Sequence, residues 1–287
     1  MGASPSKPTP EQLEELQARG DDIIERAAAA LANADVLLVA SGAGWSADSG
    51  LAVYRDVADV EEYRTRGVTY HDLCQPQVLE DDPALFYGFW GGCFNDYRRV
   101  APHAGYGIIA RWRDQLFSRA SPAARALAKA SAKMATANGA SEASEAAARP
   151  RGPFFSLTSN VDEHWLRGGR FAPAEVYECH GNTEHWQCAD RACRDSLLAE
   201  EGQPSPSGVV DCSWRAPPGF AFAVDESTRL CDAAAPPAQR ALPFDAPYCP
   251  TATSLPHDAA AFACNWPTCG ACGGKARPAV CQALGSL

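Results

Sequence analysis

The spacing of apolar residues along the first forty positions predicts one helical segment and one strand. Residues 11–32 have a composition and an apolar spacing that favour a helix, which Gly20 is expected to divide into two pieces. Residues 35–40 form a short apolar run, typical of a strand that is covered on both faces. The helical positions expected to be buried are Leu13, Leu16, Ile23, Ile24 and Leu31.

The middle of the chain repeats this alternation of helix and strand. Residues 83–117 carry aromatic and apolar side chains at helical spacing, interrupted at Pro102. Residues 153–160 read as a strand that runs into a polar turn, and residues 175–179 read as another short strand that ends at His180.

Three segments lack a periodic apolar pattern. Residues 1–10 are rich in proline and serine, and residues 120–149 are a low-complexity stretch of Ala, Ser and Lys, either a solvated helix or a disordered loop. Between Gln187 and Gly274 cysteine, proline and polar residues dominate. Because such a segment does not easily build its own core, we expect a staple such as a metal ion.

Charge and cysteine content narrow the classes of function. The chain has 287 residues and a formal charge of -10, and it contains no basic patch, so we expect no direct nucleic-acid binding. Its apolar runs are too short to cross a bilayer, and its N-terminus has no secretory signal. The 12 cysteines therefore predict metal-bound thiolates in a reducing, intracellular compartment, cytoplasmic or nuclear, rather than the disulfides of a secreted protein.

The N-terminus also fits a lipidation pattern. Met1-Gly2 followed by Ser6 matches the sequence in which an exposed glycine is myristoylated, whereas the alternative is an unmodified flexible tail. A single acyl chain on Gly2 would give only weak, reversible membrane attachment.

A glycine-rich turn follows the first predicted strand. Gly42-Ala43-Gly44 and then Ser46 are typical of the start of a dinucleotide-binding unit, in which glycines let the backbone approach a pyrophosphate. An ordinary strand-to-helix connection is the alternative for the glycines alone.

Four cysteines form two pairs that suit a metal. Cys188 and Cys193 make the first pair, Cys269 and Cys272 the second, and four thiolates around one tetrahedral Zn²⁺ form a closed, structural site. Cys264 is an alternative ligand, and four unrelated cysteines are the other alternative. Such an ion takes no part in chemistry, because no ligand position is open to water.

These segments, taken in order, resemble the sirtuin family. The resemblance rests on residues 42–55 (GAGWSADSGLAVYR), 158–162 (TSNVD), His180-Gly181 and 269–278 (CGACGGKARP). It departs from the family at Trp45, at Ala52 and at Ser159, where the family has a small aliphatic residue, a proline and a glutamine, respectively. The residues that it implies for NAD are Gly42, Ala43, Gly44, Ser46, Ser49 and Gly50 for the phosphates, Tyr54 and Arg55 in a mobile loop, and Ser159, Asn160, Asp162 and His180 around the nicotinamide ribose.

The resemblance implies roles for three catalytic residues. Asn160 would hold the ribose hydroxyls, Asp162 would bind the nicotinamide carboxamide, and His180 would accept a proton from a ribose hydroxyl. A histidine after a strand is by itself more often structural. His185 and His164 are the alternatives, but neither precedes a glycine in the same context.

The implied fold is α/β, a Rossmann-like parallel-sheet domain with an inserted small zinc-binding domain. The expected division is a flexible tail at 1–20, the Rossmann-like domain at 21–186 with an insertion at 120–150, the zinc domain at 187–275, and a return to the large domain at 276–287. The sheet strands that follow in the family are absent here, so the resemblance predicts a truncated chain of weak activity or stability.

The implied activity is NAD-dependent deacylation of an acyl-lysine protein or peptide, with release of nicotinamide and O-acyl-ADP-ribose. The cofactors are NAD and one structural Zn²⁺. Two alternatives stay open: ADP-ribosyl transfer from NAD to a protein, and an inactive zinc-bearing binding module.

Overall fold

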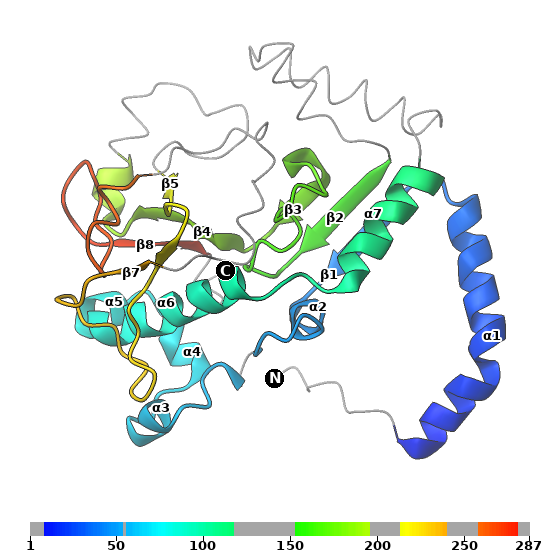
Figure 1. Ribbon diagram of the computed structural model, residues 1–287, viewed down its shortest axis with the longest axis horizontal. Helices are drawn as coiled ribbons and strands as arrows, with labels where there is room; N and C mark the ends of the chain where they lie inside the picture. The colour runs from blue at the N-terminus through cyan, green and yellow to red at the C-terminus, as the bar shows by residue number, and fades with distance from the viewer. Residues whose placement is uncertain (1–8, 54–55, 118–152, 196–212, 240–257, 281–287) are drawn as a thin grey trace, which may run out of the picture.

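The computed structural model describes residues 9–53, 56–117, 153–195, 213–239 and 258–280 (Figure 1). Within these residues no helix is long and apolar enough to cross a membrane. The helices are α1 (Pro10–Asn33), α2 (Ala43–Ala47), α3 (Glu61–Thr65), α4 (Tyr70–Leu73), α5 (Val78–Asp81), α6 (Pro83–Arg99), α7 (Ala104–Leu116) and the 3₁₀ turn η2 (Pro173–Glu175). The strands are β1 (Leu37–Ser41), β2 (Phe154–Thr158), β3 (Val176–Glu178), β4 (Gly181–Cys188), β5 (Ser213–Arg215), β6 (Phe220–Ala221), β7 (Ala238–Gln239) and β8 (Ala276–Val280).

The first sheet is parallel, as the α/β prediction requires. Its order is β1-β2-β3, with Leu37 opposite Phe154 and Thr158 opposite Glu178. Helix α7 lies beside this sheet in Figure 1. Its Tyr106 belongs to a cluster of buried side chains that also contains Leu37 of β1 and Phe154 of β2. All three strands therefore end at one edge, where the turn after β1 and the segments after β2 and β3 meet.

The opposite face of the parallel sheet is exposed and apolar. Leu38 is 62% exposed and lies opposite Phe155, while Leu157 and Tyr177 continue the same face on β2 and β3. Along each of these strands, exposed residues alternate with less exposed ones, because successive side chains point to opposite faces of a sheet.

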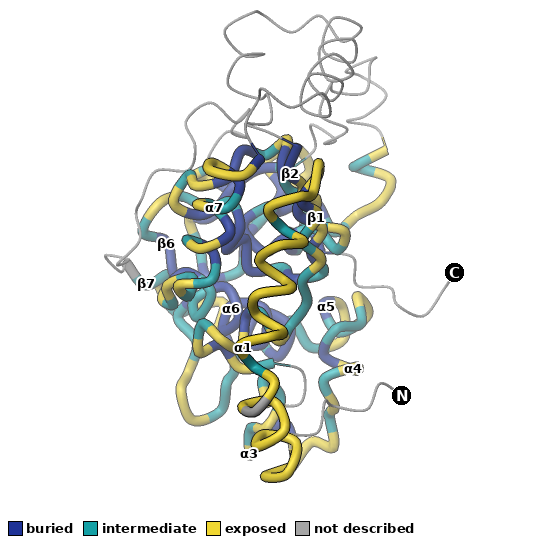
Figure 2. Tube along the Cα trace, turned by 90° about the vertical axis from the view of Figure 1, so that its right-hand side faces the viewer, coloured by how far each residue is buried: buried dark blue, intermediate teal, exposed yellow. Residues whose placement is uncertain are grey.

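Helix α1 differs from its prediction in three respects. It is one continuous helix from Pro10 to Asn33, with Gly20 in its interior, and the predicted tail boundary at residue 20 falls inside it. A capping box between Thr9 and Gln12 begins the helix, with Pro10 in its first turn. Figure 2 shows it exposed along its length, so burial is wrong for all the predicted apolar positions except Leu31, which is half-buried.

The second sheet is antiparallel and belongs to the smaller part of the molecule. Its order is β5-β4-β8, with Trp186 opposite both Trp214 and Pro278. Strand β8 pairs with β4 and not with the parallel sheet, so residues 276–280 continue the small sheet that was expected to end at residue 275.

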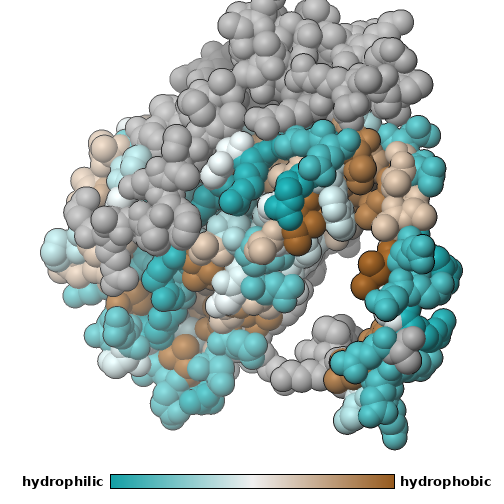
Figure 3. All heavy atoms as spheres, turned by 45° about the vertical axis from the view of Figure 1, so that its right-hand side comes forward, coloured by the Kyte–Doolittle hydropathy of each residue, from teal (hydrophilic) through white to brown (hydrophobic). Residues whose placement is uncertain are grey.

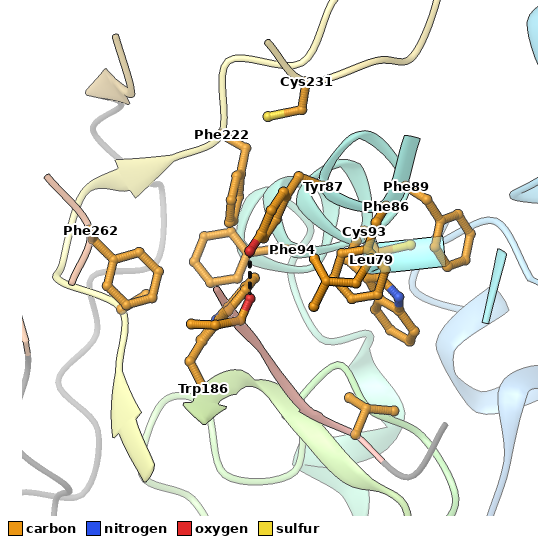
Figure 4. Packing of buried hydrophobic residues seen from close by; sticks show 14 of the residues in the cluster. Leu79, Phe86, Tyr87, Phe89, Cys93, Phe94, Trp186, Phe222, Cys231 and Phe262 are labelled. Atoms are coloured by element: carbon orange, nitrogen blue, oxygen red, sulfur yellow. Dashed lines mark hydrogen bonds between the residues drawn. The ribbon is translucent and has the colours of Figure 1, made fainter. Parts of the chain in front are cut away.

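A large aromatic cluster joins α6 to the small sheet (Figure 4). Tyr87 of α6 donates a hydrogen bond to the Ala276 carbonyl at 2.7 Å, and its ring stacks near Trp186 and Phe222. Phe262 packs edge-on against Trp186. The segment after Gln187 therefore shares a core with α6, which its irregular apolar pattern did not predict.

Candidate functional site

A cavity of about 270 Å³ lies where the parallel strands end. The turn after β1, the segment after β2 and the residue before β4 line one side, and α4 and α6 line the other. Among the predicted site residues, those in its wall are Ala43, Ser46, Ser159, Asn160, Asp162 and His180. The structure thus brings together residues from three separate sequence motifs.

The β1–α2 turn and the segment after β2 are held against each other. The Asn160 side-chain amide donates to the Gly42 carbonyl at 2.8 Å, and the Ser159 backbone N–H donates to the Ser41 carbonyl at 3.2 Å. A Cβ at Gly42 would lie 3.4 Å from the Ser159 hydroxyl oxygen, in ordinary van der Waals contact, so the turn and the segment after β2 lie close together.

Asp162 is the most buried charged group in the cavity wall, with 2% of its surface exposed. One carboxylate oxygen accepts from the Ser46 hydroxyl at 2.5 Å, and the other accepts from the His164 backbone N–H at 3.0 Å. Because each carboxylate oxygen has two lone pairs, the group can still accept a hydrogen bond from a ligand.

His164 lies next to Asp162 and Tyr97 but does not itself line the cavity. Its ring nitrogen Nδ1 lies 3.8 Å from the Asp162 carboxylate, and its Nε2 lies 3.2 Å from the Tyr97 carbonyl. Burial lowers the pKa of His164, so its imidazole is predominantly neutral near pH 7. Since it does not line the cavity, the structure favours His180 over His164 as the histidine that a ligand can reach.

Trp45 stands where the family has a small aliphatic residue, and its indole packs among neighbouring aromatic rings. Its ring lies edge-on to His103 at 4.4 Å between centroids and stacks on Trp165 at 6.0 Å. A Cβ at Gly105 would lie 2.9 Å from the Trp45 ring. Trp45 therefore packs under the turn, away from the cavity, and does not block it.

His180 is half-buried and precedes a glycine that the backbone requires. Gly181 has a φ of +72°, and a Cβ on it would lie 1.9 Å from the Ala279 carbonyl oxygen. Within the described residues, the His180 ring makes no hydrogen bond, and it forms part of the cavity wall. Its position on the cavity is consistent with the predicted base.

The remaining predicted cofactor residues lie elsewhere. Gly42, Gly44, Ser49 and Gly50 belong to the turn or follow α2 but do not line the cavity. The Ser49 hydroxyl instead accepts from the His103 backbone N–H at 3.1 Å, which ties the end of α2 to the start of α7. Tyr54 and Arg55 lie outside the described residues.

The sequence did not indicate that residues in and around α4 and α6 form part of the cavity wall. These residues are Tyr70, His71, Cys74, Gln75, Phe89, Trp90, Cys93 and Tyr97. Burial raises the pKa of the Cys93 thiol to about 12 and that of the Cys74 thiol to about 11, so both stay protonated and neutral. The signal was the dense aromatic run of residues 86–97, which was interpreted only as a helix.

A buried ion network lies next to the cavity and joins the two sheets. Glu184 of β4 accepts two hydrogen bonds from Arg98 of α6, at 2.7 and 2.6 Å, and one from Arg167 at 3.2 Å. Burial works to raise the pKa of Glu184, but Arg98 and its neighbours outweigh burial and lower it. The carboxylate is therefore ionised, and it fixes α6 against β4.

The four predicted cysteines come together at the far end of β4. Their sulfur atoms all lie within 4.8 Å of one another, and the sulfurs of Cys188 and Cys272 are 3.6 Å apart. A tetrahedral ion with Zn–S bonds of about 2.3 Å needs sulfurs about 3.8 Å apart, so this donor set fits Zn²⁺. The arrangement is a Cys₄ metal site.

The neighbouring cysteine Cys264 does not join this group. Its sulfur donates to the Trp266 carbonyl at 2.8 Å, and the four-cysteine group forms without it. None of the nine cysteines within the described residues forms a disulfide. Gly273, with a φ of +70°, closes the turn between Cys272 and Lys275.

Two curated proteins are similar to part of the chain, whereas no protein-family model matches it. An NAD-dependent protein deacylase of Deinococcus radiodurans is 28% identical over 161 residues, which cover 55% of this chain and 50% of that protein. An NAD-dependent protein deacetylase of Shouchella clausii (strain KSM-K16) is 29% identical over 86 residues, 30% of this chain and 35% of that protein. The chain thus spans half or less of the relatives that it matches.

A solved structure described as a Sir2 homolog–NAD complex has a TM-score of 0.45 and 16% identity, covering 89% of this chain and 60% of that chain. The fold and site themselves define an α/β protein with a Rossmann-like parallel sheet, a cavity at its strand ends and a small antiparallel sheet with a Cys₄ site. Over the parts that they match, the two curated relatives make the chain similar to NAD-dependent protein deacylases, in agreement with the resemblance of its motifs to the sirtuin (Sir2) family.

Proposed function

We propose that the chain is an NAD-dependent protein lysine deacylase. The observation that carries the proposal is the meeting of Ser46, Asp162 and His180, from three motifs, in the wall of one cavity. The two curated relatives are named as a deacylase and a deacetylase, which supports the same reaction class.

The cavity suits the nicotinamide end of NAD in its polar groups. A carboxamide presents an N–H donor and a carbonyl acceptor, and the Asp162 carboxylate supplies an acceptor for the first. Ser46 and the His164 backbone hold that carboxylate in place. Bound there, NAD would supply a glycosidic carbon that an acyl oxygen can attack once nicotinamide leaves.

The chain's own residues divide the remaining work. Asn160 would orient the ribose hydroxyls, although its amide is also engaged with the Gly42 carbonyl. His180 would accept a proton from a ribose hydroxyl, since its ring lies in the cavity wall and makes no hydrogen bond within the described residues. The apolar side of the cavity, with Phe89 and Trp90, would exclude water from the acyl group.

The Cys₄ site would hold Zn²⁺ in a structural role. Strand β4 runs from Gly181, beside His180, to Cys188, so at 3.4 Å per residue the ion would lie at the other end of a strand at most about 24 Å long. All four ligand positions are taken by thiolates, which leaves none for a reacting water.

The purified chain, an acetyl-lysine peptide and NAD test this function in one assay. Deacylation predicts deacetylated peptide, nicotinamide and O-acetyl-ADP-ribose by mass spectrometry, with at least about a hundredfold loss in His180→Ala. His185→Gln is the matched control, because His185 lies outside the cavity wall. ADP-ribose attached to a protein would instead indicate transferase activity, and no turnover with folded protein would indicate a binding module.

A further inference from the structure

Two buried polar side chains next to the cavity, Tyr106 and His164, each carry an atom without a hydrogen-bond partner among the described residues. Figure 3 shows many hydrophilic side chains at the surface of the molecule, where solvent can satisfy them. The Tyr106 hydroxyl and the His164 ring nitrogen Nδ1 differ from these, because each residue is only 1% exposed. Buried polar atoms are normally paired with protein or with an ordered water molecule, so these two atoms need an explanation.

The two side chains lie together beside Asp162. The Tyr106 ring of α7 is 6.1 Å from the His164 ring, centroid to centroid, and Nδ1 of His164 is 3.8 Å from Oδ2 of Asp162. Burial raises the pKa of Tyr106, and the charges of Asp162 and Glu178 raise it further, so the hydroxyl keeps its proton. The cluster therefore contains a permanent donor, a ring nitrogen and a carboxylate.

The neighbours of His164 decide which of its nitrogens carries the proton. Its Nε2 lies 3.2 Å from the Tyr97 carbonyl, which can only accept, so the proton of a neutral ring is on Nε2. Burial lowers the pKa of His164 more than the charge of Asp162 raises it. Arg167 and His103 lower it further, so the ring is neutral near pH 7 and Nδ1 is an acceptor. Nδ1 and the Asp162 carboxylate are thus two acceptors that face each other without a donor between them.

We propose that a buried water molecule joins these three groups, and that Tyr106 and His164 thereby act as positioning residues for Asp162. The water oxygen would accept from the Tyr106 hydroxyl. Its two hydrogens would go to Nδ1 of His164 and to Oδ2 of Asp162, and about three hydrogen bonds are typical of a buried water. Each atom of the cluster then has a partner with the matching donor or acceptor role.

The water bridge would fix the Asp162 carboxylate for a ligand in the cavity. Oδ2 would be filled by the Ser46 hydroxyl and the water, while Oδ1 accepts from the His164 backbone N–H and keeps one lone pair. The position left for a ligand is then on one oxygen only, which suits one N–H donor of a carboxamide. This positioning role rests on the proposed binding of NAD, whereas the water bridge itself does not.

A high-resolution crystal structure of the full chain without ligand tests the bridge. We expect density for one water within about 3 Å of the Tyr106 hydroxyl, Nδ1 of His164 and Oδ2 of Asp162. Nitrogen NMR of the chain labelled at its histidine rings should show His164 as the neutral tautomer with the proton on Nε2 at pH 7, and His164→Asn identifies its signal. Well-defined side chains without this water, or a doubly protonated ring paired directly with Asp162, would overturn the bridge.

Removal of the Tyr106 hydroxyl tests the positioning role. Tyr106→Phe keeps the ring that packs against Trp45 and Trp165 and loses only the donor. We expect the affinity for NAD, measured by titration calorimetry, to fall about tenfold, and KM for NAD to rise while kcat changes less than about threefold. Tyr177→Phe, which removes a hydroxyl from an exposed side chain, should bind NAD as the wild-type chain does.

Two variants of His164 separate positioning from packing. His164→Asn and His164→Leu both lose the contact with Tyr97, but only asparagine keeps an acceptor near the place of Nδ1, so His164→Leu should bind NAD about tenfold more weakly than His164→Asn. Equal affinities in these two variants, or an unchanged affinity in folded Tyr106→Phe, would overturn the positioning role. A wild-type chain that holds the water but binds no NAD would overturn that role together with the proposed function, and the bridge would stand.

Discussion

Among single residues, Gly181 carries two independent constraints beside the candidate site. Its φ of +72° disfavours any side chain, and its Cα lies against the Ala279 carbonyl. Gly181→Ala should therefore lower the free energy of unfolding by about 3 kcal/mol, measured by urea denaturation. Gly168, with a φ of +81° and open space around it, is the control, and Gly168→Ala should cost about 1 kcal/mol. Equal losses in the two variants would contradict the close contact.

Glu178 gives a prediction about pH. One of its carboxyl oxygens accepts from the Asn182 amide at 2.6 Å, and burial raises the pKa of Glu178 to about 8. A folded-state pKa above the unfolded value means that its protonated form stabilises the fold, fully below about pH 4.5 and less as pH rises toward 8. Glu178→Gln should thus gain about 3 kcal/mol over the wild type at pH 9 and nothing at pH 4.

Thermal unfolding across this pH range checks the Glu178 prediction. The result that would contradict it is a stability difference between the two proteins that stays constant from pH 4 to pH 9.

At this scale the sequence predicted which motif residues meet better than it predicted their other contacts. The motif residues Ser46, Asp162 and His180 do reach one cavity. Nothing in the spacing of the chain indicated that Ser49 would serve the α2–α7 contact instead, or that Trp45 would pack on Trp165. Such contacts depend on tertiary neighbours that lie 54 residues apart for Ser49 and His103 and 120 apart for Trp45 and Trp165, which local patterns do not encode.

Among the elements, β4 links the cavity to the metal site. Removing the ion should loosen the turn between Cys269 and Cys272 and, through β8, the strand that begins at Gly181. We expect one Zn²⁺ per chain by elemental analysis, and a chelator should lower the melting temperature by about 10 °C.

Two cysteine variants make the metal prediction specific. Cys272→Ser should lose the ion, whereas Cys264→Ser should keep it, because the Cys264 sulfur bonds to the Trp266 carbonyl instead. Loss of zinc in both variants to the same extent would overturn the assignment of the four ligands.

Strands β1, β2 and β3 and helices α6 and α7 were predictable from their apolar runs and from the break at Pro102, whereas β4 to β8 were not predicted. Helix α1 was predictable as a helix but not in its surroundings. Its apolar residues have the period of a buried face, but none of the described residues covers Leu16 or Ile24. Amphipathic spacing indicates that a face is apolar, not which surface covers it.

Across the whole molecule, the buried ion network joins the parallel sheet region to the small sheet. Glu184→Gln would leave Arg98 and Arg167 buried with less opposite charge, so the free energy of unfolding should fall by about 3–5 kcal/mol. Asp96→Asn, which breaks the exposed pair with Arg99, should change it by less than about 0.5 kcal/mol. Chemical denaturation of both variants measures the two effects, and similar small changes would show that the network contributes little.

The order of the motifs predicted the α/β architecture with a small metal-binding part. The change in composition along the chain did not predict where the two parts divide. The sequence texture changes near Gln187, whereas the structure runs β4 through that point and gives residues beyond it, such as Phe222, to the core around α6. Aromatic side chains that are irregularly spaced in sequence can still meet in space, because loops bring them there.

The central claim is that this cavity binds the nicotinamide ribose of NAD. The most direct test is a crystal structure of the chain grown with NAD and an acetyl-lysine peptide. We expect density for the nicotinamide carboxamide at Asp162 and for the ribose hydroxyls beside Asn160 and His180, inside the cavity. NAD bound away from these residues, or a cavity without nucleotide at saturating NAD, would contradict it.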